Sequence, residues 1–131
     1  MKALAIWVVV IAAVFGVFAV VTNALRDTEQ VFVVVDSSFP MTAVWSQVDD
    51  ALDDIDDQDR AEFALATEKD FIHGWQSSLV LVGVEPFAPC DFNTISTYPE
   101  AADADDLVLI TTPSSCDTSA LDDWKIVELT P

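Results

Sequence analysis

An uninterrupted apolar run near the amino terminus is the feature that most constrains this chain. Residues 3–22 (ALAIWVVVIAAVFGVFAVVT) carry no charge, and Thr22 is the first clearly polar side chain among them. At a helical rise of about 1.5 Å per residue, about 20 apolar residues cross a bilayer core of about 30 Å. The run therefore predicts a transmembrane anchor over residues 1–24, inserted through residues 3–22, and a short polar linker over residues 25–30.

A secretory signal peptide is the alternative interpretation of the same segment. Lys2 would form its basic start, and Thr22, Asn23 and Ala24 would form a tolerable cleavage site. The apolar core of a signal peptide is usually only about 7–15 residues long, so the length of this run favours a retained, single-pass anchor. The positive charge of Lys2 favours an amino terminus in the cytoplasm, which places the rest of the chain on the extracytoplasmic, periplasmic side.

The chain is strongly acidic, and this limits its partners. It has 23 acidic and 5 basic residues, a formal net charge of −18. A field of this sign repels nucleic-acid phosphates and anionic lipid headgroups, so no nucleic acid is expected as a partner. A solvated surface explains the charge most simply, and salt adaptation or a basic partner are the alternatives.

Residues 31–131 suffice for one small domain with its own core. Residues 30–35 are dense in valine and phenylalanine without alternation, which is typical of a strand buried on both faces of a parallel sheet. Apolar residues at helical spacing over 41–55 predict an amphipathic helix, begun by Pro40 and capped by Ser37 or Ser38.

The rest of the domain continues the alternation of strands and helices. Residues 61–70 combine helix-favouring composition with strand-like alternation, and we interpret them as a strand. Further strands are expected at 79–84, 107–111 and 125–129, a turn region at 71–78, and short helices near 92–98 and 119–123. The pattern predicts an α/β domain with three layers, a mostly parallel sheet flanked by helices.

Two cysteines, Cys90 and Cys116, are present in the whole chain. In an oxidising compartment the pair predicts one disulfide bond. The single histidine, His73, cannot complete a tetrahedral zinc site with two thiols, so structural zinc is not expected.

The stretch VFVVVDSSFPM, residues 31–41, raises the question of a functional site. In parallel sheets the ligand crevice lies at the carboxyl ends of the strands, here the turns after Val35 and Thr111. A buried strand that ends in Asp-Ser-Ser at a helix start resembles the von Willebrand factor A-type domain. In that family the first strand ends in Asp-x-Ser-x-Ser, the second and third strands form a hairpin edge, and a later strand ends in Thr-Asp-Gly.

The resemblance covers residues 31–131 and implies a metal-ion-dependent adhesion site that holds Mg²⁺ or Mn²⁺. Asp36 and Ser38 match the first two ligand positions, and Thr112 would supply a further oxygen. Pro40 takes the place of the second serine, and Thr112-Pro113 stands where the family has Asp-Gly. Because Mg²⁺ requires near-octahedral oxygen coordination, we interpret Asp36 and Ser38 first as turn and cap residues and expect no cofactor.

These features predict a non-enzymatic protein-binding module, an accessory or assembly subunit of a larger membrane protein complex. The residues expected to contact the partner are Phe39, Pro40, Phe71, His73 and Trp75. One alternative is an Mg- or Mn-dependent adhesion or chelatase-like module that uses Asp36 and Ser38. A remote alternative is a serine hydrolase at Ser37 or Ser38 with His73 as base, although the chain has no Gly-x-Ser-x-Gly turn.

Overall fold

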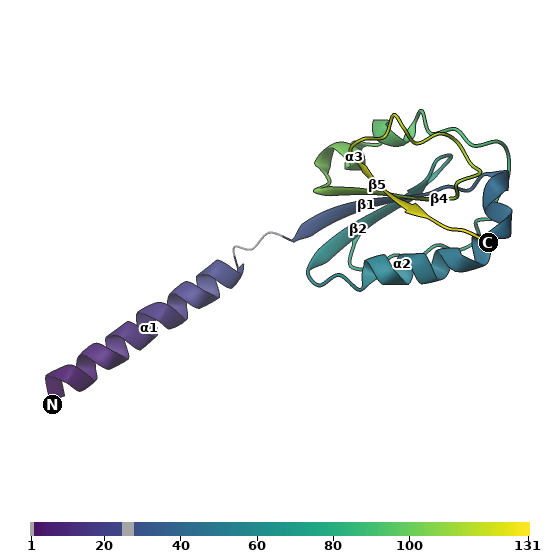
Figure 1. Ribbon diagram of the computed structural model, residues 1–131. Coiled ribbons are helices and arrows are strands. Elements are labelled where there is room, and N and C mark those ends of the chain that lie inside the picture. The colour runs from purple at the N-terminus through teal and green to yellow at the C-terminus, as the bar shows by residue number, and fades with distance from the viewer. Residues whose placement is uncertain (1, 25–27) are drawn as a thin grey trace.

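The computed structural model describes residues 2–24 and 28–131. Its first element is the helix α1 (Lys2–Ala24). The part formed by residues 2–20 is long and apolar enough to cross a membrane, and its side chains are exposed. A signal sequence would meet the same criteria of length and composition. Residues 25–27, the first part of the expected linker, lie outside the described residues (Figure 1).

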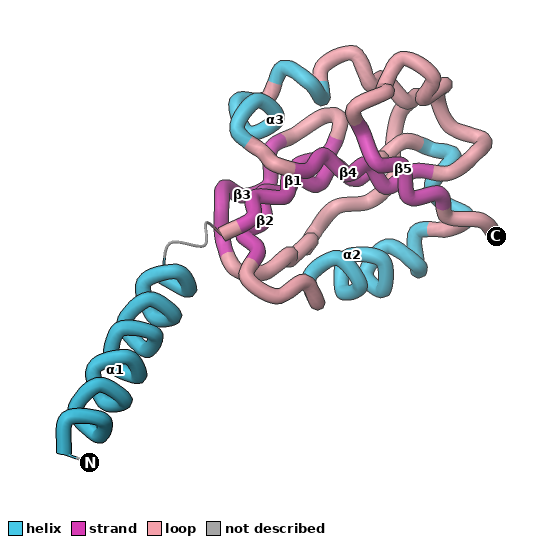
Figure 2. Tube along the Cα trace, turned by 60° about the vertical axis from the view of Figure 1, so that its left-hand side comes forward, coloured by secondary structure: helices cyan, strands magenta, loops and turns pink. Residues whose placement is uncertain are grey.

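The remaining residues form an α/β domain around one mixed sheet (Figures 1 and 2). The sheet order is β3-β2-β1-β4-β5; β3 is antiparallel to β2, and the other neighbouring pairs are parallel. The strands are β1 (Glu29–Val35), β2 (Ala61–Thr67), β3 (Phe71–Gln76), β4 (Asp106–Thr111) and β5 (Trp124–Glu128). The predicted α/β class and the predicted strands near 30–35, 61–70, 107–111 and 125–129 are confirmed, and Glu29 and Gln30 belong to β1 rather than to a linker.

The central strand β1 is buried on both faces, as its unbroken apolar sequence predicts. Val31, Val33 and Val35 belong to one core cluster, and Phe32 and Val34 belong to a second. The first cluster also contains Met41, Val48, Leu52 and Leu65, and the second contains Phe92, Ile95 and Trp124. The segment after β1 therefore contributes to the first cluster, and residues 92–104 and 116–121 contribute to the second.

The helices differ in detail from the prediction. The segment after β1 forms two 3₁₀ turns, η1 (Phe39–Ala43) and η2 (Trp45–Gln47), before α2 (Val48–Asp56). The expected single helix is interrupted at Val44, whose φ of −119° lies outside the helical range. The short helix expected near 92–98 is found as η3 (Ile95–Thr97) followed by α3 (Pro99–Asp103).

Three predictions about local structure are wrong. Residues 71–76 form β3 rather than a turn, because they pair with β2 along its free edge. Residues 79–84 are not a strand, because β3 already occupies the edge of β2. Val82 is 79% exposed, and Gly83 adopts a positive φ of 74°. Residues 119–123 form turns rather than a helix.

Candidate functional site

Buried and partly buried polar side chains gather at the carboxyl ends of three neighbouring parallel strands. We call this group the strand-end cluster; it consists of Asp36, Ser37 and Ser38 after β1, Glu68 and Lys69 after β2, and Thr111 and Ser115 at and after the end of β4. The sheet order places β1 between β2 and β4, so the three turns meet at one edge. Buried polar groups need partners, and these residues supply them to one another.

The carboxylate of Asp36 is the centre of one half of the cluster. The residue is 0% exposed. Its Oδ1 accepts a hydrogen bond from the Ser38 backbone N–H at 2.9 Å, and its Oδ2 accepts from the hydroxyl of Thr111 at 2.8 Å and from the hydroxyl of Ser115. Its own backbone N–H donates to the carbonyl oxygen of Ile110 at 2.9 Å. Asp36 therefore joins the turn after β1 to the end of β4.

The predicted helix cap is wrong for a related reason. Ser38 stands before η1, but its hydroxyl makes no capping hydrogen bond. Ser38 Oγ instead lies 3.3 Å from Ser115 Oγ. Ser38 therefore contacts the turn after β4 instead of capping the helix that follows it.

Glu68 and Lys69 form the other half of the cluster. Glu68 Oε2 accepts from the Ser37 backbone N–H at 2.8 Å and from the Ser37 hydroxyl at 3.1 Å. The Lys69 ammonium is ion-paired with Glu68 and donates to Ser37 Oγ at 3.1 Å. A buried charge is stable only when it is paired and hydrogen-bonded, and both conditions are met here.

Tyr98 supports the turn after β2 from the second core cluster. Its hydroxyl donates to the carbonyl oxygen of Thr67 at 3.0 Å. Burial raises the pKa of Tyr98, and the nearby negative charges of Asp70 and Glu68 raise it further. The phenol thus stays a hydrogen-bond donor at neutral pH.

A long segment, residues 77–94, crosses the strand ends; we call it the strap. Phe87 N–H donates to the carbonyl oxygen of Ser37 at 2.7 Å, and Phe39 N–H donates to that of Ala88 at 3.0 Å. Ala88 has a positive φ of 62°, a conformation that costs a residue other than glycine about 1–2 kcal/mol. The two backbone hydrogen bonds to the segment 37–39 hold Ala88 in this conformation.

The predicted disulfide is present and gives the strap a covalent attachment. Cys90 and Cys116 are bonded, with their Cα atoms 5.9 Å apart. Cys116 directly follows Ser115, which contacts Asp36. The disulfide therefore joins the strap to the same turn that the strand-end cluster holds.

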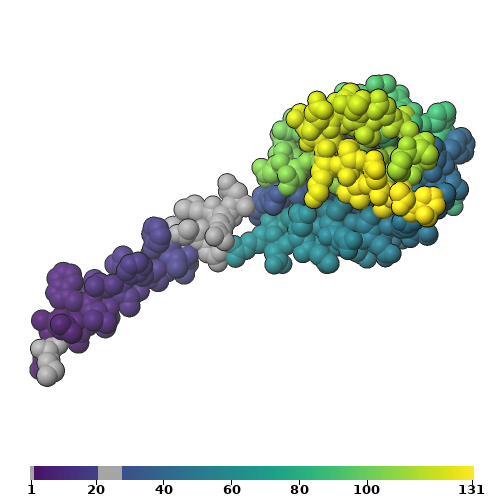
Figure 3. All heavy atoms as spheres, viewed as in Figure 1, coloured from purple at the N-terminus to yellow at the C-terminus, as the bar shows by residue number. Residues whose placement is uncertain are grey.

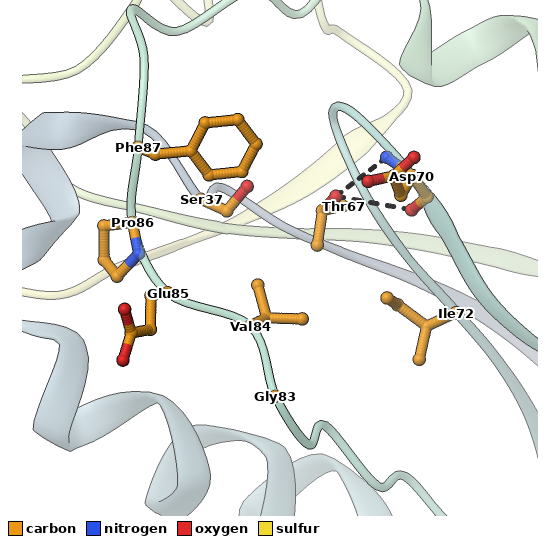
Figure 4. Close-up of a pocket in the computed structure, with 9 residues that line it drawn as sticks. All are labelled: Ser37, Thr67, Asp70, Ile72, Gly83, Val84, Glu85, Pro86 and Phe87. Atoms are coloured by element: carbon orange, nitrogen blue, oxygen red, sulfur yellow. Dashed lines mark hydrogen bonds between the residues drawn. The ribbon is translucent and has the colours of Figure 1, made fainter.

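A cavity of about 480 Å³ lies between the strap and the strand ends (Figure 4). Ser37 contributes from the turn after β1 and Thr67 from the end of β2, and Asp70 and Ile72 contribute from the β2–β3 turn and β3. Gly83, Val84, Glu85, Pro86 and Phe87 of the strap complete the lining. Figure 4 shows the Phe87 ring beside Ser37, and the Lys69 ammonium lies 4.5 Å from the centre of that ring.

The oxygens expected to bind a divalent cation are engaged by protein hydrogen-bond donors in this structure. Asp36 is the one carboxylate among the expected ligands, and it already accepts three hydrogen bonds. Thr112 bonds through its carbonyl oxygen to the Ser115 N–H at 3.0 Å, and the threonine that contacts Asp36 is Thr111. Within residues 2–24 and 28–131, no group of three or more histidine, cysteine or acidic side chains converges. Mg²⁺ needs about six oxygens and a net negative site.

The contacts also give little support to a serine nucleophile. His73 lies on β3, where its Nδ1 is 2.8 Å from the carbonyl oxygen of Gly74, and no hydrogen bond in the described part of the chain joins its ring to Ser37 or Ser38. The basic group beside Ser37 is Lys69. An ion-paired ammonium has no lone pair with which to accept the serine proton, so this pair lacks a general base.

The residues expected to contact a partner fall into two groups. Phe39 is 61% exposed and is hydrogen-bonded through its N–H to Ala88 of the strap, the residue after Phe87, which is 51% exposed. Phe71, His73 and Trp75 lie along β3, where Phe71 is exposed and the other two are half-buried. Pro40 is half-buried at the start of η1, and Trp75 packs against the second core cluster.

Sequence reasoning missed Glu68, Lys69, Thr111, Ser115 and Phe87. A usable signal existed for the hydroxyl residues, since the run TTPSS begins at the last residue of a buried strand. The Glu-Lys pair gave a similar signal after the second strand. Comparison of the chain with protein-family models, with curated proteins and with solved structures finds no match.

Proposed function

We propose that this protein is a membrane-anchored, non-enzymatic protein-binding module, an accessory or assembly subunit of a larger membrane complex, with its domain on the periplasmic side. The observation that carries the proposal is the saturated state of Asp36, which is 0% exposed and accepts three hydrogen bonds from the protein itself. A polar group so engaged holds loops in place rather than performing chemistry.

The contact surface in this proposal is an aromatic rim made of Phe39 and Phe87. Both residues are more than half exposed, backbone hydrogen bonds hold η1 and the strap together, and the disulfide also holds the strap. Phe87 also lines the cavity, and exposed aromatic side chains on well-held segments are typical of the residues that dominate binding energy. Asp70 and Glu85 on the cavity wall favour a basic side chain of the partner.

The proposal includes a three-layer, von Willebrand A-like domain in which protein hydrogen bonds replace the cation. The antiparallel β2–β3 edge supports it, because the resemblance implies a hairpin at that position. The meeting of the turns after β1 and β4 at Asp36 also supports it. In this proposal the hydroxyls of Thr111 and Ser115 satisfy the carboxylate that would otherwise bind metal.

Removing both rings of the aromatic rim tests the binding surface. We expect a Phe39→Ala/Phe87→Ala variant of the full-length, C-terminally tagged chain to retain its membrane partners at least about tenfold less, since such anchors contribute about 2 kcal/mol or more each. The measurement is mass spectrometry of proteins that co-purify from native membranes in mild detergent.

Phe71→Ala is the matched control, because it removes a 43% exposed ring from β3. It should retain the partners. Loss of partners with Phe71→Ala alone would move the surface to β3, and the absence of any defined partner of the unchanged chain would contradict the binding module.

An Mg- or Mn-dependent adhesion module is the second candidate, and the observation that favours it is that the hydroxyl oxygens of Thr111 and Ser115 lie within hydrogen-bond distance of the Asp36 carboxylate. The two candidates differ in their response to metal removal. We expect EDTA to leave the co-purifying partners unchanged, because the strand-end cluster is held by protein donors. Partners that are lost with EDTA and recovered with added Mg²⁺ or Mn²⁺ would establish the second candidate instead.

A further inference from the structure

The strand β5 has one unpaired edge. It pairs with β4 in an unbroken register from Leu107↔Trp124 to Thr111↔Glu128 and is the last strand in the sheet order. The Leu129 N–H donates to the carbonyl oxygen of Thr111 at 2.8 Å. Backbone groups alternate in direction along a strand, so those of Ile126 and Glu128 point to the outer edge. Figure 3 shows the C-terminal segment, in yellow, at the surface of the molecule.

The other edge of the sheet is less suited to further pairing. The pairing of β3 with β2 has register shifts between Phe63 and Leu65 and between Leu65 and Ala66. Irregularities of this kind twist an edge strand and discourage the addition of another strand. The edge of β5 carries no such irregularity, so it is the better template.

A groove of about 470 Å³ accompanies β5 on the side of α2. Ala51, Ile55, Val127 and Leu129 supply its apolar lining, and Asp50, Asp54, Gln47, Gln58 and Lys125 supply its polar lining. Neither Asp50 nor Asp54 has an ion-pair partner among the described residues. Asp122 and Asp123 precede β5 and Glu128 ends it, so the charge along this edge is negative in spite of Lys125.

We infer that the free edge of β5 and this groove receive an extended, basic segment of a partner protein as an additional strand. Main-chain hydrogen bonds to Ile126 and Glu128 would supply affinity, as in other cases of strand addition. Every second side chain of the segment would face the groove, where the aliphatic stem of a lysine or arginine packs against the apolar lining and its charged end lies beside Asp50 and Asp54. This surface contains no residue of the aromatic rim and is independent of it.

The test uses the full-length chain in a zwitterionic detergent and a fluorescent synthetic peptide of alternating lysine and valine. Glu128→Pro removes an outward N–H from an exposed position and is expected to weaken binding by about tenfold or more. Glu128→Ala is the matched control, since it removes the same side chain and keeps the N–H. Asp50→Asn/Asp54→Asn should weaken binding several-fold at low salt, and less at high salt.

Two modified peptides test the same pairing without changing the protein. In one peptide the backbone nitrogen of every lysine is methylated, and in the other that of every valine. Each peptide therefore loses the N–H donors along one of its edges, while its charge stays the same. We expect one of them to bind about tenfold more weakly than the parent peptide.

Equal binding of all peptides would overturn the inference, because attraction to the acidic surface alone would then explain the binding. The absence of any peptide binding would overturn it as well. Self-association of the unchanged chain that Glu128→Pro abolishes would also overturn it, in favour of a second copy at this edge. If Glu128→Pro does not fold, the modified peptides decide the question on the unchanged chain.

Discussion

Replacing Asp36 with alanine is expected to destabilise the domain by about 3–5 kcal/mol. The change leaves the Ser38 N–H and the hydroxyls of Thr111 and Ser115 without their acceptor at a site that is 0% exposed. Each buried donor left without a partner costs about 1–3 kcal/mol, and rotation of the hydroxyls recovers part of the loss. Thermal unfolding of the full-length chain in detergent, followed by near-ultraviolet circular dichroism, measures the effect.

Two further variants separate the causes of that loss. Asp36→Asn keeps the shape and one acceptor oxygen, so it should cost less than Asp36→Ala. Asp91→Ala is the control, because Asp91 is exposed and its Oδ1 accepts from the Asn93 N–H at 2.9 Å in a local turn. We expect it to cost about 0.5 kcal/mol or less. An Asp36→Ala variant as stable as Asp91→Ala would contradict the role assigned to the strand-end cluster.

Removing the disulfide is expected to have the second largest effect. Cys90 and Cys116 are 26 residues apart in sequence. Closing a loop of this length in the unfolded chain corresponds to about 3–4 kcal/mol of stability, so Cys90→Ser/Cys116→Ser should lose about that amount. The strap also loses its covalent link to the turn that carries Ser115, so partner retention through Phe87 should fall as well.

Reductant supplies the control for this prediction. Adding it to the unchanged protein should lower Tm toward that of the double variant, and adding it to the double variant should change nothing. A double variant within about 1 kcal/mol of the unchanged protein would show that hydrogen bonds alone hold the strap.

Much of the domain was predictable because local patterns specify it. The run of Val and Phe in residues 31–35 can be buried only between two covered faces, and the structure places it at the centre of the sheet. The alternation of Phe63 and Leu65 correctly indicated a strand against the helical composition of residues 61–70. Because the chain has two cysteines, only one disulfide pairing within it is possible, and the structure contains it.

Two of the errors arose where two segments could occupy the same place. Residues 71–76 and 79–84 are both rich in β-forming residues, and one edge position beside β2 was available. The shorter connection after β2 let residues 71–76 take it, and the valines of the second segment became part of the strap. Local propensity cannot rank such competitors, because the outcome depends on long-range pairing.

The amino-acid sequence by itself determined a helix that is long and apolar enough to cross a membrane, the α/β class and the disulfide. Each depends on length, period or count along the chain. Only the tertiary structure decided what Asp36 contacts. Its hydrogen-bond partners Thr111 and Ser115 lie 75 and 79 residues away, and the parallel pairing of β1 with β4 brings them together. The physical reason is that a carboxylate binds whichever donors the fold places beside it, and no local pattern specifies them.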